Sequence, residues 1–362
     1  MKETLPTVPG SSSEFGNHTP LYSVALLIAG LWRRVQLKLE GYNPSGSSKD
    51  RTAHGLIRDL QTRGLLQESS IVIESTSGNL GVSLANVCSE LGCPFTAVID
   101  PKTTSEICGR LLALGARLEM VDEQDDKGGY LLSRLKRVHD LCTESPDYLW
   151  TDQYSNPANP DAHYRSTAPE IFSQMNGQVD AIFVAVSTGG TFAGIERYFG
   201  EVSPATSVVA VDAVGSVVFG GVPGTRKLTG IGSSRLSSFI HLDRGHHHRM
   251  VADRDAFAVC RLLDRDVHLR LGGSSGAVIF ACAQALAENR EIKDAVCVCA
   301  DGGKNYESTI FSDDWMVSSG FDPGYRIPII EAVAVDIGLT NARFGHPRRS
   351  CRNQTVRLSA AM

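Results

Sequence analysis

The sequence predicts an α/β fold in which two mainly parallel sheets are covered by helices. Short apolar runs rich in β-branched residues alternate with longer amphipathic segments, and this alternation is typical of βαβ units. Several of the apolar runs lead directly into turns made of glycine and hydroxyl residues. Ligands in such folds bind beyond the carboxyl ends of the strands, so these turns are the first places to look for chemistry.

The order of the predicted elements divides the chain into two β/α series. The predicted buried strands cover residues 71–74, 95–99, 117–121, 181–186, 208–211 and 296–299. The predicted helices cover residues 51–62, 80–91, 106–114, 129–143, 255–263 and 276–289. One series therefore runs from about residue 53 to 150 and the other from about 180 to 300, with residues 156–169 as the link.

The composition is that of a globular protein and does not favour nucleic-acid or membrane binding. Hydrophobic residues make up 42% of the chain, charged residues make up 21%, and the formal net charge is -5. The longest apolar stretches, at residues 22–31 and 295–300, are shorter than the roughly 20 residues that span a bilayer. Residues 1–16 are polar and lack a secretory signal, which predicts a flexible arm on a cytoplasmic protein.

The cysteines and the histidine cluster do not predict a metal site. Cys297 and Cys299 would share one face of a strand, but buried thiols commonly serve as small hydrophobes and no ligand spacing repeats. His246, His247 and His248 lie in a polar stretch without acidic or thiol partners at a recognisable spacing. We therefore expect core cysteines, an exposed histidine loop and no bound metal.

The first chemically informative turn is Thr76-Ser77-Gly78-Asn79, which lies between a predicted strand and a predicted helix. Free backbone N–H groups at a helix start, with hydroxyls beside them, suit a carboxylate. A plain helix cap explains one hydroxyl residue but not the whole series. The turn is therefore predicted to hold the carboxylate of a substrate.

The second turn is Ser187-Thr188-Gly189-Gly190-Thr191, which again separates a buried strand from a helix. Glycines let backbone amides approach a phosphate closely, and the helix start adds positive potential. The lysine of a nucleotide-triphosphate loop is absent. A tight structural turn is the alternative, but a phosphate site is favoured.

The third feature is Lys49, which follows a turn of Pro, Gly and Ser at residues 44–48 and begins a helix. A lysine near a helix start loses its proton more readily, and a neutral amine can form a Schiff base with an aldehyde. Taken alone, Lys49 would be an ordinary surface lysine. The three turns together favour a cofactor-binding lysine.

Together with Gly272 to Ala277, these turns resemble the four signatures of the fold-type II pyridoxal-phosphate enzymes, the cysteine synthase and cystathionine β-synthase group. Their order and spacing agree from about residue 19 to 315. The resemblance implies a two-domain fold like that of the tryptophan synthase β subunit. It also implies pyridoxal 5'-phosphate as the cofactor.

The resemblance assigns a role to each turn. Lys49 would carry the cofactor, Asn79 would bond its 3'-oxygen, and residues 187–191 would hold its phosphate. Ser274 would meet the pyridine nitrogen, where a neutral hydroxyl suits elimination and replacement at the β-carbon. The substrate carboxylate would bind to Thr76, Ser77 and Gly78.

Within the family, four segments resemble the N-(2-amino-2-carboxyethyl)-L-glutamate synthases, which start 2,3-diaminopropionate formation for siderophores. The segments are residues 75–81, 153–160, 225–232 and 301–306. Leu80 stands where cysteine synthases usually carry Thr. The resemblance implies that O-phospho-L-serine and L-glutamate are the substrates, with cysteine synthesis from O-acetylserine or O-phosphoserine and sulfide as the alternative. A catalytically silent scaffold is disfavoured because Lys49 is present.

Phosphate and extra carboxylates require cations near the reacting atoms. The candidate cations near the four segments are Arg134, Arg165, Arg226 and Lys227. Gln153 and Tyr154 are further candidate substrate-binding residues. Lys49 would remove the Cα proton and later return it.

The resemblance also implies a domain organisation and partners. Residues 17–52 plus 154–317 would form the large cofactor-binding domain, and residues 53–153 a smaller mobile α/β domain. Residues 318–362 would be a tail with a basic end. A homodimer is expected, and an NAD-dependent dehydrogenase would act on the product downstream.

Overall fold

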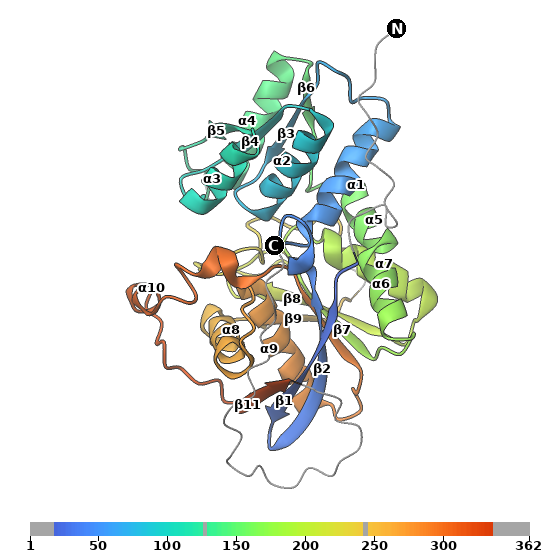
Figure 1. Cartoon of the computed structure of the whole chain (residues 1–362), viewed down its shortest axis with the longest axis vertical. Coiled ribbons are helices and arrows are strands. Elements are labelled where there is room, and N and C mark those ends of the chain that lie inside the picture. The colour runs from blue at the N-terminus through green and yellow to red at the C-terminus, as the bar shows by residue number, and fades with distance from the viewer. Residues whose placement is uncertain (1–17, 126–128, 242–244, 336–362) are drawn as a thin grey trace.

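The chain folds around two separate β-sheets, one in each half of the molecule (Figure 1). The computed structural model describes residues 18–125, 129–241 and 245–335. The larger sheet has seven strands in the order β11-β1-β2-β10-β7-β8-β9, and the smaller sheet has four in the order β5-β4-β3-β6. The α/β class that the alternating pattern predicts is therefore confirmed.

The larger sheet is parallel over most of its width. Its strands are β1 (Leu21–Ile28), β2 (Leu31–Leu39), β7 (Ala181–Ala185), β8 (Ser207–Ala213), β9 (His248–Val251), β10 (Ala295–Cys299) and β11 (Ala332–Val335). From β2 to β9 each strand is parallel to its neighbour, whereas β1 is antiparallel to both β2 and β11. The helices of this half are α7 (Gly190–Val202), α8 (Asp253–Val267), α9 (Gly273–Glu288) and α10 (Asp313–Ser318).

The smaller sheet is entirely parallel. Its strands are β3 (Ile71–Ser75), β4 (Phe95–Ile99), β5 (Arg117–Met120) and β6 (Tyr148–Trp150). Helices α2 (Asn79–Leu91), α3 (Ser105–Ala113) and α4 (Leu131–Glu144) accompany it. The central strands β3 and β4 are buried along almost their whole length, as is usual for a parallel sheet with helices on both faces.

Helix α1 (Lys49–Thr62) connects the two halves, and α5 (Ala158–Arg165) and α6 (Thr167–Gln174) lie beside it (Figure 1). It packs against α2 in one half and against α5 in the other. A Cβ on Gly55 would come within 2.8 Å of the Cβ of Ala162, so glycine permits the close approach of α1 and α5. The first residue of α1 is thereby held between the two sheets.

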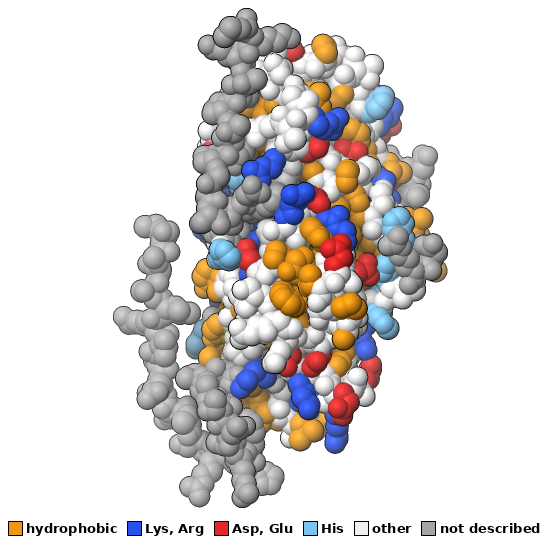
Figure 2. Space-filling model, turned by 90° about the vertical axis from the view of Figure 1, so that its right-hand side faces the viewer, with side chains coloured by type: hydrophobic (Ala, Val, Ile, Leu, Met, Phe, Trp, Pro, Cys, Tyr) orange, Lys and Arg blue, Asp and Glu red, His pale blue; other side chains and the backbone are white. Residues whose placement is uncertain are grey.

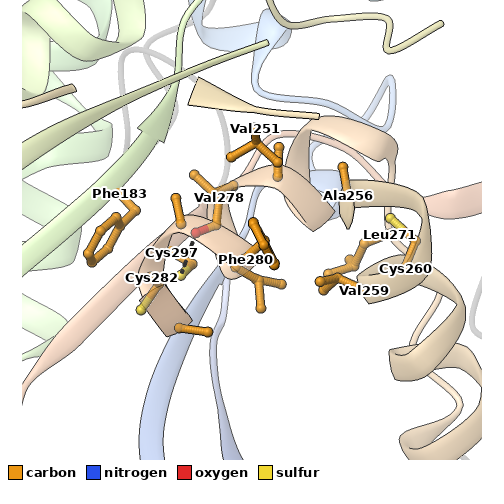
Figure 3. Packing of buried hydrophobic residues seen from close by; sticks show 14 of the residues in the cluster. Phe183, Val251, Ala256, Val259, Cys260, Leu271, Val278, Phe280, Cys282 and Cys297 are labelled. Carbon is orange, nitrogen blue, oxygen red and sulfur yellow. Dashed lines mark hydrogen bonds between the residues drawn. The ribbon is translucent and has the colours of Figure 1, made fainter. Parts of the chain in front are cut away.

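Helix α9 lies at the centre of the larger half. Residues 273–283 are all buried, which matches a sequence without a polar face. Figure 3 shows side chains of α9, such as Val278 and Phe280, packed among those of the sheet and α8, such as Phe183 and Val259. Cys297 and Cys299 are buried in β10, as expected for core cysteines.

All the strands and helices expected from the apolar pattern form, with ends shifted by a few residues. The predicted strands did not include β1, β2, β6 or β9. In β2, Arg33, Arg34 and Lys38 interrupt the apolar residues. Residues 156–169, expected to be a link, include α5, which packs against both α1 and α7.

The ends of the chain also differ from expectation. Residues 332–335 of the expected tail form β11, which pairs with β1 and so belongs to the larger sheet. The expected arm at 1–16 and the remainder of the expected tail, from residue 336, lie outside the described residues.

The described surface carries charges of both signs. Figure 2 shows acidic and basic side chains interspersed over one face of the molecule. Within the described ranges, no helix combines the length and the apolar character needed to cross a membrane. No group of three or more His, Cys, Asp or Glu side chains in the same ranges is placed to hold a metal ion.

Candidate functional site

Lys49 is the first residue of α1, and the turn before it is fastened to the end of β10. The backbone N–H of Ser48 donates to the carbonyl of Ala300 (2.8 Å). Burial of the Lys49 amine lowers its pKa, although the carboxylates of Asp301 and Glu40 oppose the shift. More of the amine is therefore neutral near pH 7 than in a surface lysine, and a neutral amine can attack an aldehyde.

A buried network of charged side chains fixes the start of α1 behind Lys49. Arg51 Nε donates to Glu40 (2.7 Å), and Arg51 Nη1 donates to Glu170 (2.7 Å). Lys38 Nζ lies 2.8 Å from the same Glu170. Burial alone would raise the pKa of both carboxyls, but the guanidinium of Arg51 lowers both pKa values below their usual range. The network joins β2, α1 and α6.

Asn79 begins α2 and is oriented by residues that follow β10. Its Nδ2 donates to Asp301 Oδ2 (2.8 Å), and its Oδ1 accepts from Asn305 (3.2 Å). Tyr306 donates its hydroxyl to the same Asp301 oxygen (2.7 Å). Burial raises the pKa of Asp301, and its Oδ1 has no hydrogen-bond partner. The second N–H of the Asn79 amide remains available for a ligand.

The Ser187 to Thr191 loop joins β7 to α7, and its residues are buried or partly buried. Gly189 has φ 93°, in the left-handed region that favours glycine, and α7 begins at Gly190. A Cβ on Gly190 would overlap the side chain of Asn159. The N–H groups at this helix start are therefore uncovered by any side chain of Gly189 or Gly190, as a phosphate cradle requires.

Two flanking segments hold the Ser187 to Thr191 loop in place. Ser187 Oγ donates to the carbonyl of Gly232 (3.1 Å), and Ser237 Oγ donates to the carbonyl of Thr188 (2.6 Å). On the other side, Asn159 Nδ2 donates to Thr188 Oγ1 (3.3 Å). The segment 230–240 thus lies along one edge of the loop.

His163 is a buried residue of this site that the sequence did not reveal. Its Nε2 lies 3.0 Å from Thr52 Oγ1 and 3.2 Å from Thr191 Oγ1, and its Nδ1 lies 2.9 Å from Thr167 Oγ1. Burial lowers the pKa of His163 to about 3, and the charge of Lys49 contributes. A neutral imidazole therefore connects α1 to the Ser187 to Thr191 loop. It lies in a segment expected to be only a link, so no local pattern marked it.

Ser274 is buried in the first turn of α9. A Cβ on Gly230 would lie 4.0 Å from Ser274 Oγ, so the turn before Ile231 faces this hydroxyl. A Cβ on Gly272 would overlap the Asp301 carboxylate, which explains the glycine at that position. The site therefore offers a neutral hydroxyl where a ring nitrogen could be bonded.

The turn after β3 contains the expected substrate residues. Thr76 is buried and its Oγ1 accepts from the N–H of Gly81 (2.9 Å), while Ser77 is exposed and Gly78 is partly exposed. Gln153 Nε2 donates to the carbonyl of Ser75 (2.9 Å), so Gln153 reaches the same turn. The structure brings these residues together at the carboxyl end of the smaller sheet.

Glu74, which the sequence did not single out, fastens that turn to the segment after β6. The Glu74 carboxyl accepts from Thr151 Oγ1 (2.6 Å) and from the backbone N–H groups of Ser75 (2.8 Å) and Gln153 (3.0 Å). Burial raises the pKa of Glu74 to about 7, and these donors oppose the shift. The sequence did not mark Glu74 as a site residue because it belongs to a short apolar run, residues 71–74, that predicts an ordinary strand.

The phenol of Tyr154 is influenced by the charges of two guanidinium groups. Burial raises the pKa of the Tyr154 phenol to about 12, and the charges of Arg134 and Arg235 act in the opposite direction. Arg134 is buried in α4, with its Nε 3.3 Å from Asp100 Oδ2, yet its Nε and Nη1 have no hydrogen-bond partner. Arg235 lies over the Tyr154 ring, 5.3 Å from its centre.

Two of the other candidate cations, Arg226 and Arg165, have protein partners in the structure. Arg226 donates to the carbonyl of Gly215 (3.2 Å) and contacts Gly232, so it fastens the loop after β8. Arg165 pairs with Asp161 on the surface. Arg235, three residues after Gly232, was missed because a single arginine in a serine-rich stretch has no distinguishing pattern.

The histidine loop also differs from expectation. His246 is not free of acidic partners, because its Nδ1 lies 2.6 Å from Glu196 Oε1. Its Nε2 lies 2.7 Å from the carbonyl of His241, and its side chain is only 6% exposed. The ring therefore packs into the protein, whereas His247 and His248 are exposed. Glu196 lies on α7, fifty residues earlier in the chain, which is why the sequence spacing did not show it.

The groups at the ends of β3, β7 and β10 fit pyridoxal 5'-phosphate. Lys49 supplies an amine of lowered pKa for the aldehyde, and α7 begins at Gly190, so its N-terminus offers positive potential for a phosphate. The Ser274 hydroxyl and the second amide N–H of Asn79 are neutral groups suited to a pyridine ring and its phenolic oxygen. Each of these groups therefore matches one part of the cofactor.

Comparison with known proteins agrees with this fit. A family model described as pyridoxal-phosphate dependent enzyme matches residues 13–301. A protein of Ralstonia nicotianae named N-(2-amino-2-carboxyethyl)-L-glutamate synthase is 38% identical over 87% of this chain and 96% of its own length. A protein of Cupriavidus metallidurans with the same name is 38% identical over 83% of this chain and 89% of its own.

Solved structures show the same architecture. A hydrogen sulfide-producing enzyme of Fusobacterium nucleatum aligns with a TM-score of 0.75 and 27% identity, covering 83% of this chain and all of that one (100%). An O-acetylserine dependent cystathionine β-synthase of Helicobacter pylori aligns with a TM-score of 0.74 and 27% identity, covering 84% and 99%.

Proposed function

Because the chain belongs to the pyridoxal-phosphate dependent enzymes, we propose that it joins O-phospho-L-serine to L-glutamate by replacement at the serine β-carbon. The products would be N-(2-amino-2-carboxyethyl)-L-glutamate and phosphate. The names of the relatives that are 38% identical support this reaction.

The observation that carries the choice of substrate is the buried guanidinium of Arg134. A buried cation is costly unless it is paired and hydrogen-bonded, and Asp100 satisfies only part of it. Its Nε and Nη1 could complete their hydrogen bonds with a phosphate, for which arginine has suitable geometry. Tyr154 lies beside it and follows Gln153, which contacts the substrate turn.

In the proposed reaction, Lys49 carries out both proton transfers at Cα. When bound, pyridoxal phosphate would withdraw electrons from the Cα of the attached amino acid. Lys49 Nζ, whose pKa is lowered by burial, would take the Cα proton, and the phosphate would leave the β-carbon with the electron pair of the C–O bond. The amine nitrogen of glutamate would then bond to the β-carbon. Lys49 would return the proton to Cα.

The alternative is cysteine synthesis from O-acetylserine and sulfide, which uses the same cofactor contacts. The structural neighbours include an O-acetylserine dependent enzyme and a hydrogen sulfide-producing enzyme. An acetyl ester is neutral, however, and gives no reason to bury a guanidinium with unpartnered N–H groups. Arg134 therefore favours the phosphorylated substrate.

Product analysis tests the proposal directly. The holoenzyme would be mixed with O-phosphoserine and either glutamate or sulfide, and the products identified by mass spectrometry. We expect the C–N-bonded adduct and one phosphate released for each adduct formed. Cysteine from sulfide with no adduct from glutamate would overturn the proposal and support the alternative.

A further inference from the structure

Arg235 reaches the proposed substrate site from the segment that borders the phosphate loop. Its guanidinium lies 5.3 Å from the centre of the Tyr154 ring. The segment itself is fixed: Gly232 donates its backbone N–H to Val186 (2.7 Å), and Ser237 bonds to Thr188. Arg235 thus extends from a held backbone toward the same phenol that Arg134 approaches from α4.

The charge of Arg235 is uncompensated within the described ranges. No carboxylate there forms an ion pair with it, and its one side-chain hydrogen bond is a long contact of Nη2 with Ser238 Oγ (3.5 Å). By contrast, the exposed Arg197 is paired with Asp161, and the exposed Arg270 is paired with Asp264. A held, half-buried and unpaired guanidinium beside a substrate site is suited to an anionic ligand.

We infer that Arg235 binds a carboxylate of the incoming glutamate, which makes it a specificity-determining residue for the second substrate. This inference rests on the proposed function. Arg134 is the buried cation, and the proposed function assigns it to O-phospho-L-serine, the substrate that binds first. Arg235 is only partly buried, so it remains accessible to a substrate that enters from solvent afterwards. The planar guanidinium can hold a carboxylate through two parallel hydrogen bonds.

The test compares Arg235→Ala, Arg235→Lys and a control, Arg265→Ala. Arg265 is an exposed arginine in the last turn of α8, where it is paired with Asp266. Phosphate release would be followed with one substrate varied and the other saturating, to give a KM for glutamate and a KM for O-phosphoserine separately. Cofactor content measured for each variant would show that the site remains assembled.

Arg235→Ala should raise the KM for glutamate roughly tenfold or more, since a charge-assisted hydrogen bond is lost. The KM for O-phosphoserine should change less than about twofold, and Arg265→Ala should match the parent in both. Arg235→Lys should fall between Arg235→Ala and the parent, because it keeps the charge but not the planar fork. With sulfide as the nucleophile, Arg235→Ala should react as the parent does.

Other outcomes overturn the inference in recognisable ways. An unchanged KM for glutamate, with the parent making the adduct, would exclude Arg235 as its ligand and leave the proposed function intact. An increase confined to O-phosphoserine would assign Arg235 to the leaving phosphate instead. A parent that forms no adduct with glutamate would overturn the proposed function and this inference together.

Discussion

Asp301 accepts a hydrogen bond from the side-chain amide of Asn79 at 2.8 Å, although the two residues are 222 positions apart in the chain. Asn79 starts α2 in the smaller half, and Asp301 follows β10 in the larger half. The contact therefore joins the two halves at the site itself. The Asp301 charge also raises the pKa of Lys49, against the effect of burial.

Replacing Asp301 with Asn should change how the cofactor attaches to Lys49. Removing the carboxylate removes the interaction that raises the pKa of Lys49, so that pKa should fall further. Attachment of pyridoxal phosphate should then begin at a lower pH than in the parent. Borohydride reduction across a pH series, followed by peptide mapping, measures this.

Tyr306→Phe is the matched control for Asp301→Asn, because it removes a donor to Asp301 but keeps the charge. Its pH curve should stay closer to that of the parent. A label on a lysine other than Lys49 in the parent would contradict the assignment of the anchor.

Gly190→Val should weaken cofactor binding, because any Cβ at this position overlaps Asn159 and displaces the start of α7. Overpacking of this kind typically costs about 1–3 kcal/mol. Fluorescence titration with pyridoxal phosphate would give the change in Kd. Gly200→Ala, on the exposed end of the same helix with no atom near its Cβ, should leave the Kd unchanged. Equal affinity for Gly190→Val and the parent would place the phosphate elsewhere.

Arg134→Gln should impair use of O-phosphoserine while the cofactor remains bound. The substitution removes the buried charge beside Tyr154 but keeps a polar side chain of moderate size. Losing a hydrogen bond to a charged group costs about 1.5–3 kcal/mol, or roughly tenfold or more in affinity. Kinetics with O-phosphoserine and with O-acetylserine would separate the two leaving groups. A similar loss with both would indicate that Arg134 acts on the fold rather than on phosphate.

Glu170→Gln should destabilise the protein strongly, because it leaves Arg51 and Lys38 buried with one negative partner fewer. Breaking a buried ion pair costs about 3–5 kcal/mol, which denaturant unfolding can resolve. The exposed pair of Arg165 with Asp161 is the control, and Arg165→Ala should cost less than about 1 kcal/mol. A small effect of Glu170→Gln would show that the network contributes little to stability.

The same network predicts a direction for pH dependence. The pKa values of Glu40 and Glu170 are lower in the folded state than in the unfolded chain, so folding favours their ionised forms. Their stabilisation is complete above the unfolded pKa of about 4.3 and is lost as pH falls through the folded values. Unfolding free energies measured downward from pH 6 should therefore fall more steeply in the parent than in Glu170→Gln.

The sequence determined those parts of the protein that depend on neighbouring residues. The strands and helices of both β/α series follow from local apolar spacing, and the pyridoxal-phosphate family follows from four contiguous motifs. The binding properties of a turn depend on neighbouring residues, because a glycine or a helix start affects only the backbone groups next to it. The sequence alone therefore predicts Lys49 and the Ser187 to Thr191 loop as cofactor-binding residues.

Only the tertiary structure decided which side chains face one another across the site. Arg226 and Arg235 look alike in the sequence, yet Arg226 binds the loop after β8 and Arg235 lies over Tyr154. His163 and Glu74 had no local signal because their partners come from other elements. The physical reason is that a buried polar group needs a hydrogen-bond partner, and the packed fold can supply one from any part of the chain. Such partners are separated along the sequence by no regular spacing, so no local pattern reveals them.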